Sequence, residues 1–214
     1  KLLTGSITKS LLIFALPMIA GNLLQQCYNI ADTIIVGRFL GADALAAVGS
    51  AYTLMTFLTS IILGLCMGSG ASFSISYGQQ DFDRMKSGIF QSFVFIGAVT
   101  VVLNVAVFAG IRGIIWFLRV PGSITGLMED YLLVIFAGIV GTFLYNYFAC
   151  LLRSIGNSRV PLIFLAVSAV MNIVLDLVFV VVFYWGVAGA AFATILSQYV
   201  SGVGLAVYTR IRFP

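Results

Sequence analysis

The chain has 214 residues, of which 61% are hydrophobic and only 8% are charged. Soluble domains carry about 25% charged residues, so this composition excludes a water-soluble fold and predicts an integral membrane protein. The formal net charge is +4, but the basic residues are dispersed along the chain, which argues against a nucleic-acid partner. The chain contains no His, which excludes His-based acid–base catalysis and His-ligated zinc or haem iron.

Six apolar stretches are long enough to cross a bilayer as helices. A membrane-spanning helix needs about 20 mainly apolar residues, and no period-two alternation competes with a helical interpretation. We therefore predict an all-α bundle of six transmembrane helices that forms one domain over residues 1–214. The predicted spans are about 10–36, 44–76, 87–111, 127–152, 160–184 and 187–209.

The basic residues predict the orientation of these spans. With the N-terminus in the cytoplasm, eight basic residues fall inside and three fall outside, which is the usual positive-inside bias. The inside group is Lys1, Lys9, Arg84, Lys86, Arg153, Arg159, Arg210 and Arg212, and the outside group is Arg38, Arg112 and Arg119. We therefore expect a multi-pass protein with both ends of this segment on the cytoplasmic side.

The first span carries a polar stripe that ends in a carboxylate. At about 100° per residue, its members fall within an arc of about 120° on one helix face. They are Asn22, Gln25, Tyr28, Asn29 and Asp32. Interhelical hydrogen bonding needs only one or two such groups, so the stripe favours the wall of a water-accessible cavity.

Pro17 lies inside the same span. It removes one backbone hydrogen bond and predicts a kink in the helix. The kink is either static or a hinge coupled to the state of Asp32.

Two acidic residues, Asp32 and Asp176, lie inside apolar stretches, whereas the other five lie in or near the gaps. A carboxylate in the hydrocarbon centre costs about 2.5–3.5 kcal/mol on insertion scales. Asn172 precedes Asp176 by one turn, Asn146 lies in the fourth span and Thr194 in the sixth. Their neighbours Thr142, Tyr145, Ser197, Gln198 and Ser201 are also polar. Carboxylate, amide and hydroxyl oxygens suit a proton or Na⁺, although neighbouring donors could also satisfy a buried Asp without any exchange.

Four segments of the chain carry a family resemblance. They are QQCYNIADTIIVGRFLGADALAAVGS, the turn LLRSIGNSRVPL, the pair MNIVLD and the segment WGVAGAAFATILSQ. In order and spacing they resemble the multidrug and toxic compound extrusion (MATE) transporters, in a bacterial branch. The resemblance covers nearly the whole chain.

The resemblance implies twelve helices in two six-helix lobes, with this chain as the N-terminal lobe and the C-terminal lobe outside it. It also implies antiport in a bacterial cytoplasmic (inner) membrane, in which cationic or amphiphilic compounds leave as H⁺ or Na⁺ enters. No cofactor or nucleic acid is implied, and the partners are the lipid bilayer and small compounds.

The family's functional residues can be carried over position by position. The resemblance places the first-helix acid at Asp32, with Tyr28 one turn before it and the bend at Pro17. Its other counterparts are Asn146, Asn172, Asp176 and Thr194. In some members such groups surround a cation, which here implies Na⁺ at Asp32, Asn172, Asp176 and Thr194. Some members have a second fourth-helix amide where this chain has Ala149.

Two other functions fit parts of this pattern. A lipid-linked precursor flippase shares the architecture, but it is expected to have a cationic cavity, and the first and fifth spans contain no Arg or Lys. An intramembrane aspartyl protease could use Asp32 and Asp176 as its dyad, since two acids can share one proton. Neither acid, however, lies in the Gly-x-Gly pattern of those proteases.

Overall fold

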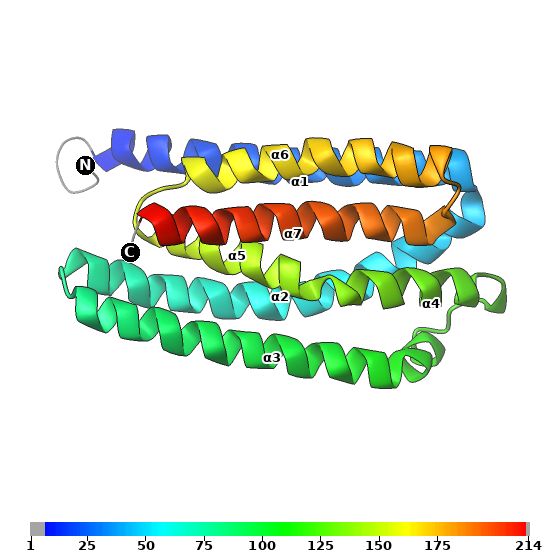
Figure 1. Cartoon of the computed structure of the whole chain (residues 1–214), viewed down its shortest axis with the longest axis horizontal. Coiled ribbons are helices and arrows are strands. Elements are labelled where there is room, and N and C mark those ends of the chain that lie inside the picture. Colours follow the sequence, from blue (N-terminus) through cyan, green and yellow to red (C-terminus); the bar gives the residue numbers. More distant parts are fainter. Residues whose placement is uncertain (1–6, 213–214) are drawn as a thin grey trace.

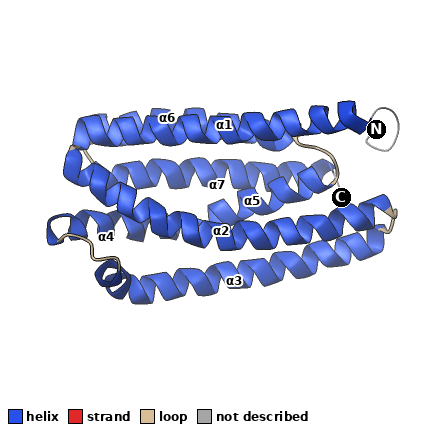
Figure 2. Cartoon of the chain, turned by 180° about the vertical axis from the view of Figure 1, so that it is seen from behind, coloured by secondary structure: helices blue, strands red, loops and turns tan. Residues whose placement is uncertain are grey.

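The computed structural model describes residues 7–212. Within this range the regular elements are all helices, and they run roughly side by side along the long axis of the molecule (Figure 1). They are α1 (Ile7–Leu40), α2 (Ala42–Gly78), α3 (Phe82–Phe117), α4 (Gly122–Ala137), α5 (Ile139–Ser154), α6 (Arg159–Asp176), the π-helical segment η1 (Leu177–Val182) and α7 (Gly186–Arg212). Short loops join them, and α1 begins at the same end of the bundle at which α7 finishes (Figure 2).

Local sequence signals explain where the helices begin and end. Gly41 has a φ of 90°, a left-handed conformation that glycine adopts without strain, so a single residue separates α1 from α2. Asp81 caps α3 by accepting a hydrogen bond from the Arg84 backbone N–H at 3.0 Å. Asn157 Oδ1 accepts from the Val160 N–H at 3.3 Å and so caps the start of α6.

Four helices in the described range are long and apolar enough to cross a membrane, namely α2, α3, the continuous α6–η1 unit and α7. The bent pair α4–α5 adds a fifth if it is counted as one span. The polar stripe of α1 gives a physical reason why this helix is not among them. The structure therefore supports an all-helical membrane bundle but does not by itself establish six spans. The helices extend beyond the predicted spans: α3, for example, exceeds 87–111 at both ends.

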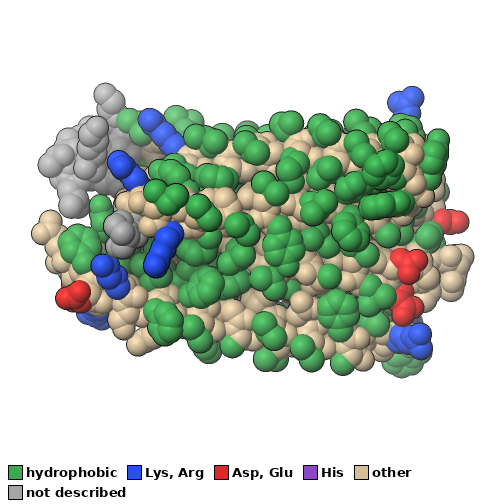
Figure 3. Space-filling view, in the orientation of Figure 1, with side chains coloured by type: hydrophobic (Ala, Val, Ile, Leu, Met, Phe, Trp, Pro, Cys, Tyr) green, Lys and Arg blue, Asp and Glu red, His purple; other side chains and the backbone are tan. Residues whose placement is uncertain are grey.

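The surface agrees with a membrane environment. Apolar side chains cover the middle of the visible face, whereas charged side chains gather at the two ends of the bundle (Figure 3). Large exposed apolar residues occur on all the long helices, for example Leu23 on α1, Phe95 on α3 and Val170 on α6. An apolar band between two charged rims matches the hydrocarbon core and its interfaces.

The fourth predicted span is not one continuous helix, because it breaks at Gly138. There α4 and α5 meet at a bend of 47°. The Phe136 carbonyl at the break accepts a hydrogen bond from Asn104 Nδ2 at 3.0 Å, and the Ala137 carbonyl accepts from the Tyr199 hydroxyl at 3.3 Å. Side chains of α3 and α7 thus satisfy carbonyl groups that the end of α4 leaves without a helical partner.

Glycines allow α7 to lie almost backbone to backbone against α5. A Cβ on Gly202 would lie 2.7 Å from the Gly141 carbonyl oxygen and 3.0 Å from the Tyr145 nitrogen, and a Cβ on Gly138 would overlap the Ile195 side chain. Small residues at such positions are what permit close helix packing in a membrane. The break and the α5–α7 contact therefore form one closely packed unit.

We predict that Gly202→Ala destabilises the protein by about 1–3 kcal/mol, the usual cost of overpacking. The new methyl group would meet backbone atoms of α5, which cannot rotate out of its way. Thermal unfolding in detergent measures the change. Gly113→Ala is the matched control because its Cβ would have no atom within 4 Å. Equal melting temperatures for the two variants would contradict this packing.

Candidate functional site

Asp32 and Asp176, which we call the acid pair, meet in the interior where α1 packs against α6 and η1. The Asp176 side chain is 0% exposed, and Asp32 is half-buried. Their carboxyl groups lie within direct interaction range of each other. Among the described residues, neither Oδ1 atom has a hydrogen-bond partner. The pair therefore has two buried oxygens free to accept a proton or a cation.

Asn172 connects Asp176 to α7. With its amide oriented so that both ends are satisfied, Asn172 Nδ2 donates to Asp176 Oδ2 at 3.2 Å, and Asn172 Oδ1 accepts from the Thr194 hydroxyl at 3.3 Å. Asn172 and Thr194 are both buried. The structure therefore brings together Asp32, Asp176, Asn172 and Thr194, the four residues at which the resemblance implies Na⁺.

A small cavity, which we call the acid cavity, lies beside Asn172 and Thr194, and neither acid lines it directly. Its polar lining comes from Tyr28, Ser168, Asn172, Thr194, Ser197 and Gln198. The space accommodates about one water molecule, and Tyr28 also lies within electrostatic range of both acids. A site of this size suits a proton, a water molecule or a small cation, and it is far too small for a drug.

The sequence analysis missed Tyr131 of α4. Its side chain is 5% exposed and lies within electrostatic range of both acids and of Tyr28. Tyr131 opens an apolar stretch, where tyrosine is common as an interface residue, and no local motif marks it. Only the packing of α4 against α2 and α7 brings this phenol to the acid pair.

Other predicted residues lie elsewhere. Asn146 is half-buried and donates from Nδ2 to the Thr142 carbonyl of its own helix at 2.8 Å, and it is not among the residues that line the acid cavity. The polar stripe of α1 divides: Tyr28 and Asp32 reach the site, whereas Asn22 is exposed. Helix α1 passes through Pro17 as one helix, and the hinge there stays a prediction.

A π-helical segment begins directly after Asp176. It ends where the Phe183 N–H donates to the Val178 carbonyl, five residues earlier, at 2.9 Å. Beyond it, the Trp185 ring stacks on Phe179 at 5.0 Å between centroids. Short π-helical turns inside α-helices are rare and occur frequently at functional sites. This irregular turn immediately follows the buried acid.

Comparison with known proteins places this geometry in a family. The family model described as MatE matches residues 17–178, which is most of the chain and includes both acids. The chain belongs to the MATE family. A probable multidrug resistance protein YpnP of Bacillus subtilis is 36% identical over 91% of this chain. A second probable multidrug resistance protein of the same organism, YoeA, is 30% identical over 97% of this chain.

The fold agrees with this assignment. A crystal structure described as MATE in the bent conformation superposes with a TM-score of 0.90 at 26% identity, over 97% of this chain and 46% of the other. The chain spans 44% of the length of YpnP and 46% of YoeA. It therefore corresponds to about half of a MATE transporter.

Membership of the family decides the general class. MATE proteins are multi-pass membrane transporters for small compounds and are not enzymes. This excludes the interpretation of the chain as an intramembrane aspartyl protease. MATE transporters need no cofactor, and within residues 7–212 no cluster of three or more Cys, Asp or Glu side chains could hold a metal ion.

We predict that Asn172→Leu destabilises the protein by about 1–3 kcal/mol, the cost of leaving a buried acceptor unpaired. The cause is that Asp176 Oδ2 loses its donor. Replacing both partners with apolar residues removes that penalty, so Asn172→Leu/Asp176→Leu should be less destabilised than the sum of the single changes. Thermal unfolding of the four proteins measures the coupling. Strictly additive effects would show that the two side chains do not interact.

Proposed function

We propose that this chain is the N-terminal lobe of a multidrug efflux antiporter, which exports cationic or amphiphilic compounds in exchange for H⁺ or Na⁺. The observation that carries the proposal is the contact between the carboxyl groups of Asp32 and Asp176 in the interior. Two carboxylates that share a buried site cannot both remain ionised without a proton or cation between them. The acid pair is thus the coupling site, and the names of the relatives supply the class of substrate.

The lobe crosses the membrane six times in this proposal. The spans are α1, α2, α3, the bent α4–α5 pair, the α6–η1 unit and α7, all in one domain over residues 1–214. Although α1 is less apolar than the others, two of its polar side chains, Tyr28 and Asp32, lie at the buried site. Burial of polar side chains against other helices is how a membrane bundle tolerates such a helix.

Both ends of the segment face the cytoplasm of a bacterial inner membrane in this proposal. The chain order of the described helices puts six basic residues at the end where α1 begins and α7 finishes, against three at the opposite end. The first group is Arg84, Lys86, Arg153, Arg159, Arg210 and Arg212, and the second is Arg38, Arg112 and Arg119. Lys1 and the Lys9 side chain lie outside the described residues. The excess supports the positive-inside orientation.

The mechanism is competition for negative charge. When the acid pair is occupied by H⁺ or Na⁺, the lobe loses the charge that attracts a cationic compound; when the ion leaves, that charge returns. Occupants that exclude each other have a positive, unfavourable coupling free energy, which a two-state transporter converts into exchange. Asn172 and Thr194 hold Asp176 in place, Tyr28 and Tyr131 flank the pair, and the bend at Pro17 moves α1.

The drug binds outside the acid cavity, because that cavity accommodates only about one water molecule. The cleft between this lobe and the C-terminal lobe of the whole transporter is the space left for it. The flippase alternative expects a cationic cavity, whereas the charged groups that this lobe places in its interior are the acid pair, and the first and fifth predicted spans contain no Arg or Lys. This supports a cationic or amphiphilic substrate over a pyrophosphate-linked one.

We predict that Asp32→Asn in the full-length transporter abolishes export without loss of expression, since an amide cannot take up or release the coupling ion. Ethidium efflux from cells that express each variant measures this. Asp43→Asn is the control, because Asp43 is an exposed carboxylate in the first turn of α2. Normally coupled export by the Asp32→Asn variant would contradict the proposed role of the acid pair as the coupling site.

We predict that the Na⁺ gradient and the pH gradient, varied separately, differ in their effect on export. Collapse of the coupling gradient should stop export by the wild-type transporter, while collapse of the other leaves it unchanged. Efflux from the same cells identifies the ion, with Na⁺ omitted at constant external pH in one arm and nigericin added in K⁺ buffer to dissipate the pH gradient in the other. Export that persists when both gradients are absent would rule out antiport.

A further inference from the structure

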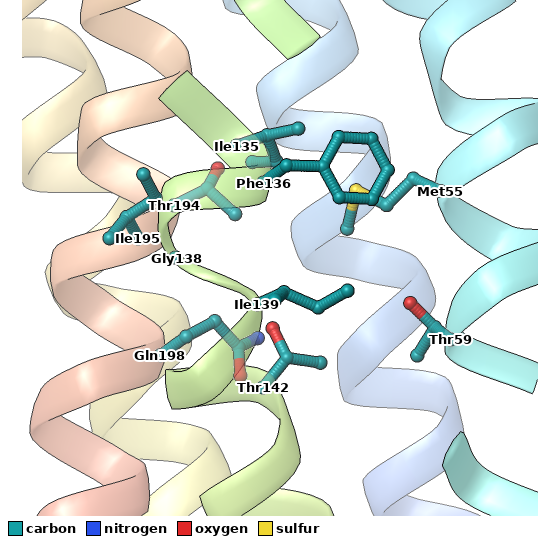
Figure 4. Close-up of a pocket in the computed structure, with 10 residues that line it drawn as sticks. All are labelled: Met55, Thr59, Ile135, Phe136, Gly138, Ile139, Thr142, Thr194, Ile195 and Gln198. Atoms are coloured by element: carbon teal, nitrogen blue, oxygen red, sulfur yellow. The ribbon is translucent and has the colours of Figure 1, made fainter. Parts of the chain in front are cut away.

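A second cavity, which we call the break cavity, lies where α4 and α5 part at Gly138. Residues of α2, α4, α5 and α7 line it, and its polar lining is Thr59, Thr142, Thr194 and Gln198 (Figure 4). Like the acid cavity, it has room for about one water molecule.

One buried polar atom of a residue that lines this cavity has no donor among residues 7–212. Gln198 Oε1 is buried and has no hydrogen-bond partner among the described residues. Figure 4 shows the Gln198 amide beside the Thr142 hydroxyl, and Thr59 lines the cavity from α2. A buried acceptor without a donor costs about 1–3 kcal/mol, and a buried water typically makes about three hydrogen bonds. Because no charged side chain lines the cavity, a water molecule fits it better than a bare cation does.

The surrounding structure fixes this cavity in place. Asn104 and Tyr199 bind the carbonyls of Phe136 and Ala137 at the break, and Gly138 lies so close to Ile195 that a Cβ would overlap its side chain. The bend is therefore held from α3 and α7 on either side. A cavity at such a bend is preorganised for its occupant.

The acid cavity and the break cavity share two lining residues. Thr194 and Gln198 line both of them, and Thr194 is the residue that Asn172 links to Asp176. Polar groups thus continue from the acid pair through Asn172 and Thr194 to Gln198 and into the break cavity.

This line of polar groups leads toward the end of the bundle where α1 begins and α7 finishes. Helix α7 runs toward that end (Figure 1), and Gln198 lies one turn beyond Thr194 along it. Helix α5 runs the same way, with Thr142 just past the break and Asn146 one turn further. Because Thr194 and Gln198 line both cavities, the two lie at the same level along α7, on the terminus-bearing side of the acid pair. This is the cytoplasmic side in the proposed orientation.

We propose that the break cavity binds one water molecule through Gln198, Thr142 and Thr59, and that this water is the first station for the coupling ion as it leaves the acid pair toward the cytoplasm. The water site stands on the cavity alone, whereas its role in ion release rests on the proposed function. Gln198 lies between the two cavities, and the ion passes its side chain as it moves from one cavity to the other.

The water site is tested by a structure of the full-length transporter in which ordered water is visible. The expected result is one water within hydrogen-bond distance of Gln198 Oε1 and of the Thr142 hydroxyl, and its loss in Gln198→Leu. A break cavity without this water in the wild-type protein overturns the proposal.

The role in ion release is tested by counter-ion flux into proteoliposomes that contain the full-length transporter. Gln198→Leu should slow the flux by about tenfold, the factor that one buried hydrogen bond is worth, and leave the dissociation constant for ethidium unchanged. Thr142→Val, a nearly isosteric change, should act in the same direction. Val200→Leu is the control, because Val200 is exposed on the same helix.

A parallel Asp32→Asn measurement separates the two proposals. If Asp32→Asn stops the flux while Gln198→Leu and Thr142→Val leave it at the wild-type rate, the release route is wrong and the coupling site stands. If Asp32→Asn leaves the flux intact, the coupling site is wrong and the release route falls with it.

Discussion

A carboxyl group taken out of water is costly, and this bundle places two of them against each other. Asp176 is completely buried, and Asp32 meets it from α1. Like charges at such a site repel strongly unless a proton or cation lies between them. Polar groups surround the pair: Asn172 donates a hydrogen bond to Asp176, and Thr194 donates one to Asn172. The helix becomes π-helical immediately after Asp176. This arrangement supports the proposal that the acid pair binds one positive charge.

The glycine contacts between α5 and α7 control the geometry around this site. Gly141 and Gly202 let the two backbones approach, and the break at Gly138 bends the fourth span by 47°. Thr194 and Gln198 lie on the face of α7 that this bend leaves facing a small cavity. Close packing without Cβ atoms and a small cavity at the break are thus two consequences of the same helix pair.

Much of this could be predicted from the sequence, and the rest depends on packing. The long apolar stretches predicted a helical membrane bundle, and the cost of Asp32 and Asp176 in an apolar stretch marked both acids. The i, i+4 spacing put Asn172 beside Asp176. No local pattern indicates the break at Gly138, because its bend is held by Asn104 and Tyr199 from other helices. The positions of Tyr131 near the acid pair and of Gln198 between the two cavities could not be predicted for the same reason, because both depend on contacts between helices that are distant in the sequence.

Infrared difference spectroscopy of the full-length transporter, with ¹³C-labelled aspartate, tests most directly whether the acid pair shares one positive charge. In Na⁺-free buffer at neutral pH, a protonated carboxyl band should be present, shift with the label, vanish in Asp32→Asn/Asp176→Asn, and decrease when ethidium binds. Two fully ionised aspartates under these conditions, with no protonated band that depends on either residue, would contradict the shared charge.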